Sequence, residues 1–162
     1  MTRTAIRAAA MLLMMASGSL AQAPAPAKPL ATNATNWGDG VTIDLMSVER
    51  KGSILTVKWQ VRNQGAAAAH VKFALSGNSQ TTYAVDEESG TKYYVLTDKE
   101  KNSLASAHQD LNYGSYGIDD SIAPGASARY WMKLPAPPPA VKTISVFFSK
   151  VEPFESVAIS DK

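Results

Sequence analysis

One stretch in the first half of the chain alternates strictly between apolar and polar residues. Residues 55–62 read Leu-Thr-Val-Lys-Trp-Gln-Val-Arg, so an apolar side chain occupies every second position. A helix would scatter these apolar side chains around its circumference, whereas a β-strand places all of them on one face. The stretch therefore predicts a strand with one face in an apolar core and the other in water, as in antiparallel sheets.

Six further stretches repeat this pattern less regularly, and turn residues such as Gly, Asn and Pro separate them. They cover residues 41–45, 71–75, 83–85, 92–97, 128–134 and 144–148. No amphipathic helix longer than a turn or two is evident. This pattern predicts an all-β fold, an immunoglobulin-like antiparallel sandwich of two sheets and about seven strands, over residues 37–162.

The N-terminus has the order of segments found in a secretory signal peptide. Arg3 and Arg7 precede an apolar run over residues 8–16, and small residues including Ser19 and Ala21 follow. The apolar run is too short to cross a bilayer as a permanent anchor. We therefore expect residues 1–21 to be a signal peptide cleaved after Ala21. The processed protein would be periplasmic or secreted, with no stable membrane span.

Residues 22–36 differ in composition from the segments on either side. They begin Gln-Ala-Pro-Ala-Pro-Ala-Lys-Pro and contain few large side chains that a core could bury. Alternating alanine and proline disfavours a helix and favours an extended chain. We expect a flexible Pro/Ala-rich tether between the signal peptide and the domain.

Charge and cysteine content exclude several classes of function. The chain has 16 basic and 14 acidic residues, and loss of Arg3 and Arg7 would leave 14 of each. A neutral domain lacks the basic excess that nucleic-acid binding requires, so no nucleic-acid partner is expected. The chain has no cysteine, which excludes disulfides, thiolate metal sites and thiol nucleophiles.

Few side chains could perform catalysis. His70 and His108 have no second histidine or carboxylate at metal-ligand spacing. Ser115 lies in Gly-Ser-Tyr-Gly, which is not the strand-to-helix elbow of serine hydrolases. Hydrolysis would require Ser115 and His108 to meet in space. The sequence predicts a protein that is not an enzyme and has no cofactor.

Aspartates are the remaining candidates for a metal site. Asp110, Asp119 and Asp120 could supply the oxygen ligands that calcium prefers. Acidic turns between strands explain the same residues without a metal, because aspartate is common in turns. We predict no metal site and keep calcium binding at these three residues as the alternative.

Aromatic residues give the clearest indication of a binding surface. Trp131 alternates with the core positions of its strand and shares the polar face with Arg129. The strand pattern lapses over residues 98–123, and long loops often carry function. That region contains Tyr113 and Tyr116. Because aromatic residues and arginine are enriched at interfaces, we predict a ligand site formed by Trp131, Arg129, Tyr113 and Tyr116.

Several motifs resemble those of a family of uncharacterised bacterial secreted immunoglobulin-like β-sandwich domains, which occur in exported proteins and lipoproteins. The resemblance covers most of the chain after Val41, and the stretch Tyr-Trp-Met-Lys-Leu-Pro-Ala-Pro-Pro at residues 130–138 is its most distinctive part. The other matching segments are residues 93–98, 104–106, 122–125 and 153–159. The resemblance implies the fold and an envelope location, and it implies no enzymatic activity. The chain departs from the lipoproteins in lacking a cysteine for lipid attachment.

Together these features predict an exported, non-enzymatic binding or scaffolding domain of the bacterial envelope. The expected partner is an envelope or secreted protein, bound through protein–protein contacts. The alternative is a carbohydrate- or peptidoglycan-binding module that uses surface aromatics to hold a cell-wall glycan.

Overall fold

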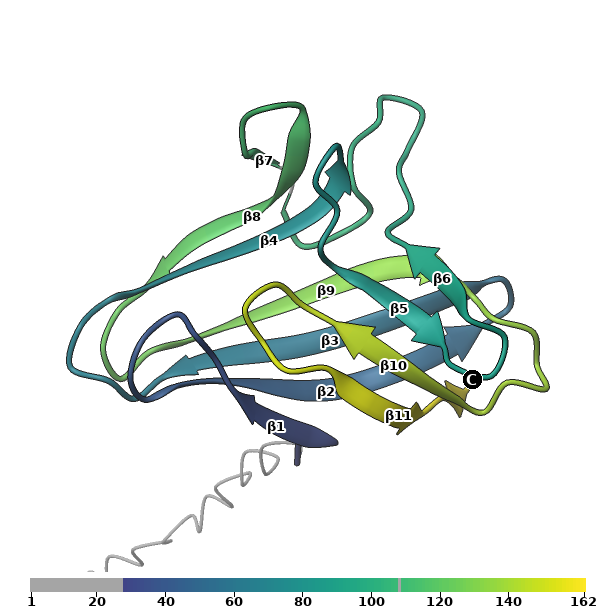
Figure 1. Ribbon diagram of the computed structural model, residues 1–162, viewed down its shortest axis with the longest axis horizontal. Coiled ribbons are helices and arrows are strands. Elements are labelled where there is room, and N and C mark those ends of the chain that lie inside the picture. The colour runs from purple at the N-terminus through teal and green to yellow at the C-terminus, as the bar shows by residue number, and fades with distance from the viewer. Residues whose placement is uncertain (1–27, 108) are drawn as a thin grey trace, which may run out of the picture.

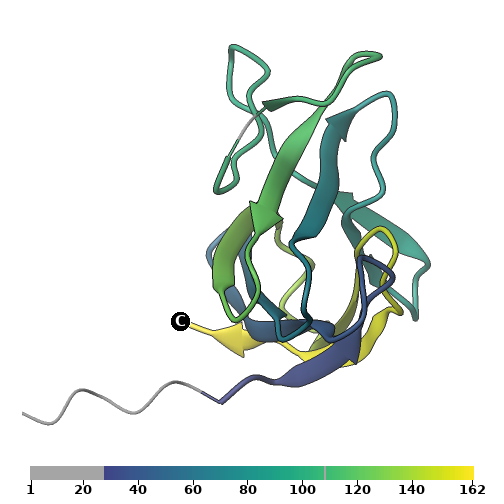
Figure 2. The same cartoon turned by 90° about the vertical axis from the view of Figure 1, so that its left-hand side faces the viewer.

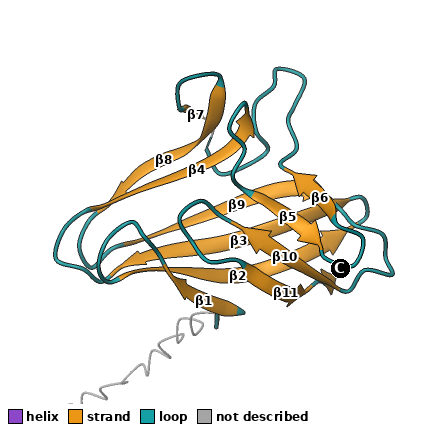
Figure 3. Cartoon of the chain, in the orientation of Figure 1, coloured by secondary structure: helices purple, strands orange, loops and turns teal. Residues whose placement is uncertain are grey.

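A computed structural model of the chain describes residues 28–107 and 109–162. The expected signal peptide, residues 1–21, and the start of the expected tether, residues 22–27, lie outside the described residues. The described part consists of antiparallel sheets, with one short parallel pairing, and has no helix (Figures 1 and 3). It therefore offers no apolar helix of bilayer-spanning length. The all-β prediction is confirmed.

The largest sheet forms one layer of the molecule. Its strand order is β1-β2-β3-β9, and the short β12 pairs in parallel with β2. These strands are β1 (Ala31–Ala34), β2 (Val41–Lys51), β3 (Ile54–Asn63), β9 (Ser127–Pro135) and β12 (Ser160–Asp161).

Two smaller sheets lie over the inner face of the first. One has the order β4-β8-β7 and the other β11-β10-β5-β6. Their strands are β4 (Ala69–Gly77), β5 (Tyr83–Asp86), β6 (Thr91–Tyr94), β7 (Gln109–Asp110), β8 (Ser115–Ile122), β10 (Thr143–Phe147) and β11 (Phe154–Ala158). The layering is consistent with a β-sandwich, but two sheets stand where one was expected. The chain after β4 folds back so that the Ala74 carbonyl accepts the N–H groups of Thr81 and Thr82, and β5, which follows, pairs with β10 and β6.

Trp59 on β3 lies at the centre of the core. Its side chain is 1% exposed, and its ring centroid lies 5.3 Å from Phe73 on β4 and 4.9 Å from Phe148, which follows β10. The ring of Tyr130 on β9 is 5.7 Å away. Edge-to-face and tilted contacts of this kind suit the charge distribution of aromatic rings. The alternation of residues 55–62 therefore predicted the buried face correctly, and that face joins the first sheet to both others.

β1 lies within the range for which a flexible tether was expected. Residues Ala31–Ala34 pair with β2, and the Thr32 hydroxyl donates a hydrogen bond of 2.6 Å to Asp44 Oδ1. Pairing depends on backbone groups, so this strand forms although its side chains are small. Strand pairing in the described part therefore starts at Ala31, before the boundary that was expected at Trp37.

β8 lies within residues 98–123, where the strand pattern lapses. It runs beside β4 for most of its length, and Figure 2 shows the two strands as a twisted ribbon. Its glycine at position 117 sits where a Cβ atom would overlap the carbonyl oxygen of Phe73. The close approach of β4 and β8 thus requires glycine here.

Candidate functional site

Trp131 projects from the outer face of the first sheet. In the register of β3 and β9, Trp131 lies opposite Lys58, and Arg129 lies opposite Gln60. The Trp131 side chain is 38% exposed, while its neighbours Tyr130 and Met132 face the core. We name the outward residues of these two strands the Trp131 face: Thr56, Lys58, Gln60, Arg62, Arg129, Trp131 and Lys133.

Trp131 is contacted at its ring by Lys133 and at its backbone by Ser106. The Lys133 Nζ atom lies 5.8 Å from the centroid of the Trp131 ring, a cation–π arrangement. Ser106 covers the free edge of β9, where its Oγ accepts the Trp131 N–H at 2.5 Å and its N–H donates to the Trp131 carbonyl at 3.0 Å. The loop before β7 therefore supports the strand that carries the tryptophan.

The Trp131 face carries an excess of positive charge. It has four cationic residues and no acidic one. Arg62 is neutralised by Asp44 on β2, through bonds of 2.6 and 2.9 Å that lower the pKa of Asp44 and raise the pKa of Arg62. Lys58 reaches Glu49 at 3.5 Å. In the described part of the chain, Arg129 and Lys133 form no ion pair, so their charges are available at the surface.

Tyr113 lies at a different place, in the turn between β7 and β8 at the top of Figures 1 and 2. Its side chain is 94% exposed, and it stands at the rim of an open groove of about 250 Å³. We name this the Tyr113 groove. It is lined by Lys72, Ala74, Ser79, Thr81, Leu111, Asn112, Tyr113, Ser115, Ser149 and Lys150.

The turn that carries Tyr113 has three consecutive residues in the left-handed region. Asn112, Tyr113 and Gly114 have φ values of 75°, 54° and 69°. Such a conformation is unfavourable for a bulky residue like tyrosine. Hydrogen bonds hold the turn, because Asn78 donates to the carbonyls of Tyr113 (3.0 Å) and Gly114 (3.1 Å).

Ser115 begins β8 beneath this turn. Its side chain is buried, and its hydroxyl has no hydrogen-bond partner among the described residues. His108, the other half of the hydrolytic alternative, lies outside the described residues. A strand and not a helix follows Ser115, whereas the nucleophile elbow of a hydrolase needs a helix there. Ser115 therefore does not occupy such an elbow.

The four predicted ligand residues do not form one platform. Trp131 and Arg129 share the outer face of the first sheet, whereas Tyr113 lines a groove on the outer side of the β4-β8-β7 sheet. The inner faces of these two sheets meet at Trp59 and Phe73, so their outer faces point in opposite directions. Tyr116 is half-buried within β8.

The aspartates considered for calcium are each engaged separately. Asp119 contacts His70 at 3.0 Å, while Asp120 accepts a hydrogen bond of 2.8 Å from the Tyr130 hydroxyl on the core side. Asp110 accepts the N–H of Asn112 at 2.8 Å, as aspartates in turns commonly do. The described residues contain no group of three histidines or carboxylates that could hold a metal ion.

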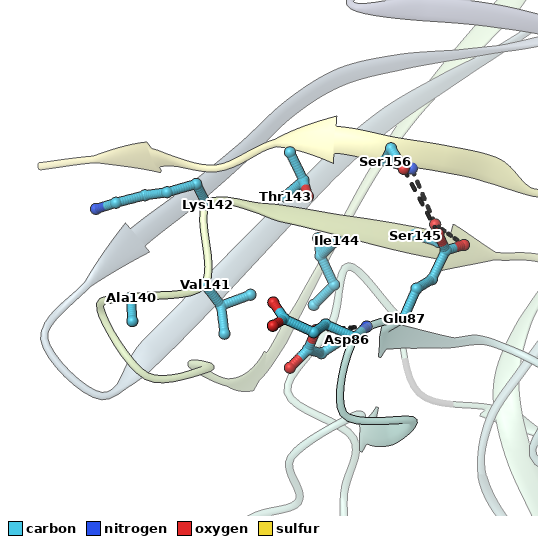
Figure 4. A pocket seen from close by; sticks show the side chains of 10 residues that line it. Asp86, Glu87, Ala140, Val141, Lys142, Thr143, Ile144, Ser145 and Ser156 are labelled. Atoms are coloured by element: carbon cyan, nitrogen blue, oxygen red, sulfur yellow. Dashed lines mark hydrogen bonds between the residues drawn. The ribbon is translucent and has the colours of Figure 1, made fainter.

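A second hollow, drawn in Figure 4, is lined by Asp86, Glu87 and Glu88 together with Lys142. Glu87 accepts the hydroxyl of Ser145 at 2.5 Å and that of Ser156 at 3.5 Å, as Figure 4 shows. Asp86 accepts the hydroxyl of Ser89 at 2.6 Å and the N–H of Glu88 at 3.2 Å. These carboxylates connect β5 to β10 and β11 and form the turn after β5, which accounts for them structurally.

Sequence reasoning placed Lys133 on the face of Trp131, but it missed Lys58 as a neighbour of Trp131 and the two lysines of the Tyr113 groove. Lys58 was recognisable as a polar-face residue of residues 55–62, but its position beside Trp131 depends on the register of β3 and β9. Lys72 and Lys150 reach the Tyr113 groove from segments far apart in the chain, and no local pattern marks them. No family model, curated protein or solved structure matches this chain.

Proposed function

We propose that this chain is an exported, non-enzymatic binding module of the bacterial envelope that docks a protein partner on the Trp131 face. The observation that carries the proposal is the composition of that face. An exposed tryptophan is flanked by Arg129 and Lys133, and neither cation is neutralised within the described residues.

The residue types favour a protein partner with an acidic contact surface. Tryptophan and arginine are enriched among the residues that dominate the energy of protein–protein interfaces. Cations around the tryptophan would steer an acidic partner and increase its association rate at low salt. The backbone beneath Trp131 is fixed on both edges by β3 and by Ser106, so docking would need little reorganisation.

Affinity capture from an envelope extract of the source cells tests the proposal. A partner is expected to be retained by the wild type and by Tyr113→Ala, and to be lost with Trp131→Ala and with Arg129→Glu. Its retention should weaken between 50 and 500 mM salt, because salt screens exposed charges. Equal capture by all variants, or turnover of a wall polymer by the purified protein, would contradict the proposal.

Export is proposed from Arg3, Arg7 and the apolar run at residues 8–16. Expression with a C-terminal epitope tag, followed by cell fractionation, tests it. The protein is expected outside the cytoplasm with a new N-terminus at Gln22. Replacement of Leu12 and Leu13 by Asp should keep it inside at full length.

A further inference from the structure

We propose that the Tyr113 groove binds an anionic saccharide, at a site independent of the Trp131 face. The proposal does not depend on docking of a protein partner, because the two places lie on opposite outer faces of the molecule. Four properties of the groove support it: an exposed ring, a set of neutral hydrogen-bonding groups, two cations, and a fixed backbone.

The ring of Tyr113 is positioned for stacking. At 94% exposed, it makes almost no packing contribution to the fold. A sugar ring has an apolar C–H face, and a flat aromatic side chain at the edge of a groove complements such a face. Tyrosine also has a polar hydroxyl at its tip, which suits a surface that is wet when unoccupied.

Neutral polar groups line the rest of the groove. Three hydroxyls come from Ser79, Thr81 and Ser149, and an amide comes from Asn112. Hydroxyls and amides both donate and accept hydrogen bonds, so they match a ligand that is itself rich in hydroxyls. Ser115 adds a buried hydroxyl without a partner in the wall beneath Tyr113.

Two lysines determine the expected charge of the ligand. Lys72 and Lys150 line the groove, and no acidic residue does. Lys72 contacts Asp119 at 3.5 Å, outside the groove lining, whereas Lys150 forms no ion pair within the described residues. A carboxylate or phosphate on the sugar would pair with the Lys150 ammonium group, and Lys72 would add further positive charge to the groove.

The backbone around the groove is held before any ligand arrives. Three non-glycine residues of the lining have left-handed φ values: Asn112 at 75°, Tyr113 at 54° and Lys150 at 61°. Hydrogen bonds retain this geometry, because the Lys150 carbonyl accepts the N–H of Asn36 at 3.0 Å and the Tyr113 carbonyl accepts Asn78. Strained residues held by their surroundings are typical of ligand sites. A fixed site also loses little conformational entropy on binding.

The size of the groove indicates how much of a ligand it holds. Its volume of about 250 Å³ lies just below the ~300 Å³ at which sites for drug-sized ligands begin. We therefore expect one acidic sugar unit to occupy the groove, with the remainder of a glycan chain extending past Tyr113 into solvent.

Calorimetric titration of the purified protein tests the proposal with three probes. Trigalacturonate supplies carboxylates, glucose 6-phosphate supplies a phosphate, and maltotriose is neutral. At least one anionic probe is expected to bind about tenfold or more tightly than maltotriose. Its affinity should fall as the salt concentration rises. The probe that binds distinguishes a carboxylated from a phosphorylated source.

Variants locate the site. Tyr113→Ala is expected to lower the affinity for the anionic probe about tenfold or more, because it removes the stacking ring. Lys150→Gln should reduce the preference for the anionic probe over maltotriose. Trp131→Ala is the matched control, since it removes an exposed aromatic from the other outer face, and it should bind as the wild type does. Urea unfolding of each variant checks that it is folded.

Three results would overturn the proposal. One is the absence of saturable binding by both anionic probes. Another is unchanged affinity in Tyr113→Ala that has the stability of the wild type. The last is loss of binding in Trp131→Ala alone, which would place the saccharide site on the Trp131 face and not in the Tyr113 groove.

Discussion

Arg50 on β2 binds the carboxylate of Asp161 on β12 through two hydrogen bonds of 2.6 and 3.1 Å. Its Nη1 atom also donates to the carbonyl oxygens of Pro137, Pro138 and Val141 at 3.2, 2.8 and 3.1 Å. The Arg50 side chain is only 5% exposed. One buried guanidinium thus connects the second strand, the proline-rich loop after β9 and the C-terminal strand.

Replacing Arg50 by Leu should lower the free energy of unfolding by about 2–4 kcal/mol, because it leaves several carbonyl oxygens of the proline-rich loop without a donor. Arg50→Lys should cost less but should not be neutral, since an ammonium group cannot reproduce the forked geometry of guanidinium. Urea unfolding measures both. A loss below about 0.5 kcal/mol in Arg50→Leu, the usual range for an unremarkable surface site, would show that these bonds do not stabilise the fold.

The ion pair of Asp44 and Arg62 predicts a dependence of stability on pH. The pKa of Asp44 lies below its ordinary value, chiefly because of the Arg62 hydrogen bond, and burial opposes that effect. The folded state thus holds this proton less tightly than the unfolded state. The stabilisation is present above the unfolded pKa of about 3.9 and is lost as pH falls through the lower folded pKa.

Urea unfolding of the wild type and Asp44→Asn between pH 7 and pH 3 measures this effect. The difference in unfolding free energy between the two proteins should be constant down to about pH 5 and should shrink below about pH 4. A difference that does not change over this range would mean that the Asp44 carboxylate has the same pKa in both states.

The left-handed backbone of Tyr113 predicts a variant that gains stability. Tyr113→Gly should raise the free energy of unfolding by about 0.5–1 kcal/mol. Glycine adopts a φ of 54° without steric cost, and this gain exceeds the larger conformational entropy that glycine loses on folding. Tyr113→Ala keeps the Cβ atom and should not gain. Thermal unfolding distinguishes them. If the saccharide proposal is right, both variants lose the ligand, so the glycine variant exchanges binding for stability.

Gly117 predicts a large cost for a single added methyl group. A Cβ atom there would overlap the carbonyl of Phe73 and lie 3.1 Å from the Leu111 side chain. Gly117→Ala should therefore lower the free energy of unfolding by about 2 kcal/mol or more by forcing β4 and β8 apart. Gly52→Ala is the contrasting variant, because Gly52 has a positive φ of 58°, which Gly117 does not, and no atom lies within 4 Å of its added Cβ. It should cost about 1 kcal/mol, from the backbone alone.

The alternation of apolar residues predicted seven strands, and each overlaps an observed one: β2, β3, β4, β5, β6, β9 and β10. β8 was not predicted because Asp119, Asp120 and Ser121 interrupt its apolar residues, and Asp120 is exposed while its carboxylate accepts the Tyr130 hydroxyl. Gly117 further obscures the pattern. The pattern also did not predict β1, because the residues of this strand are small and its stability comes from pairing with β2. A pattern of hydrophobicity does not reveal a strand whose contacts are polar or made by the backbone.

The candidate sites were predictable only in part. Period-two alternation placed Trp131 and Arg129 on one outward face, and the register of β9 confirms this placement. Tyr113 was recognised as a loop aromatic, but the face it occupies depends on which sheet β8 joins. That pairing links residues far apart in the chain, and local sequence does not specify it.

Two short strands share one edge of β2, since β1 pairs with Thr42–Leu45 and β12 pairs with Glu49 and Arg50. β1 directly precedes β2 in the chain, whereas β12 is the last strand of the described part. An unpaired strand edge readily accepts strands from other molecules. β12 therefore covers the part of this edge that β1 does not reach, and without residues 160–161 the backbone of Glu49 and Arg50 would be open on that side to a strand from another molecule.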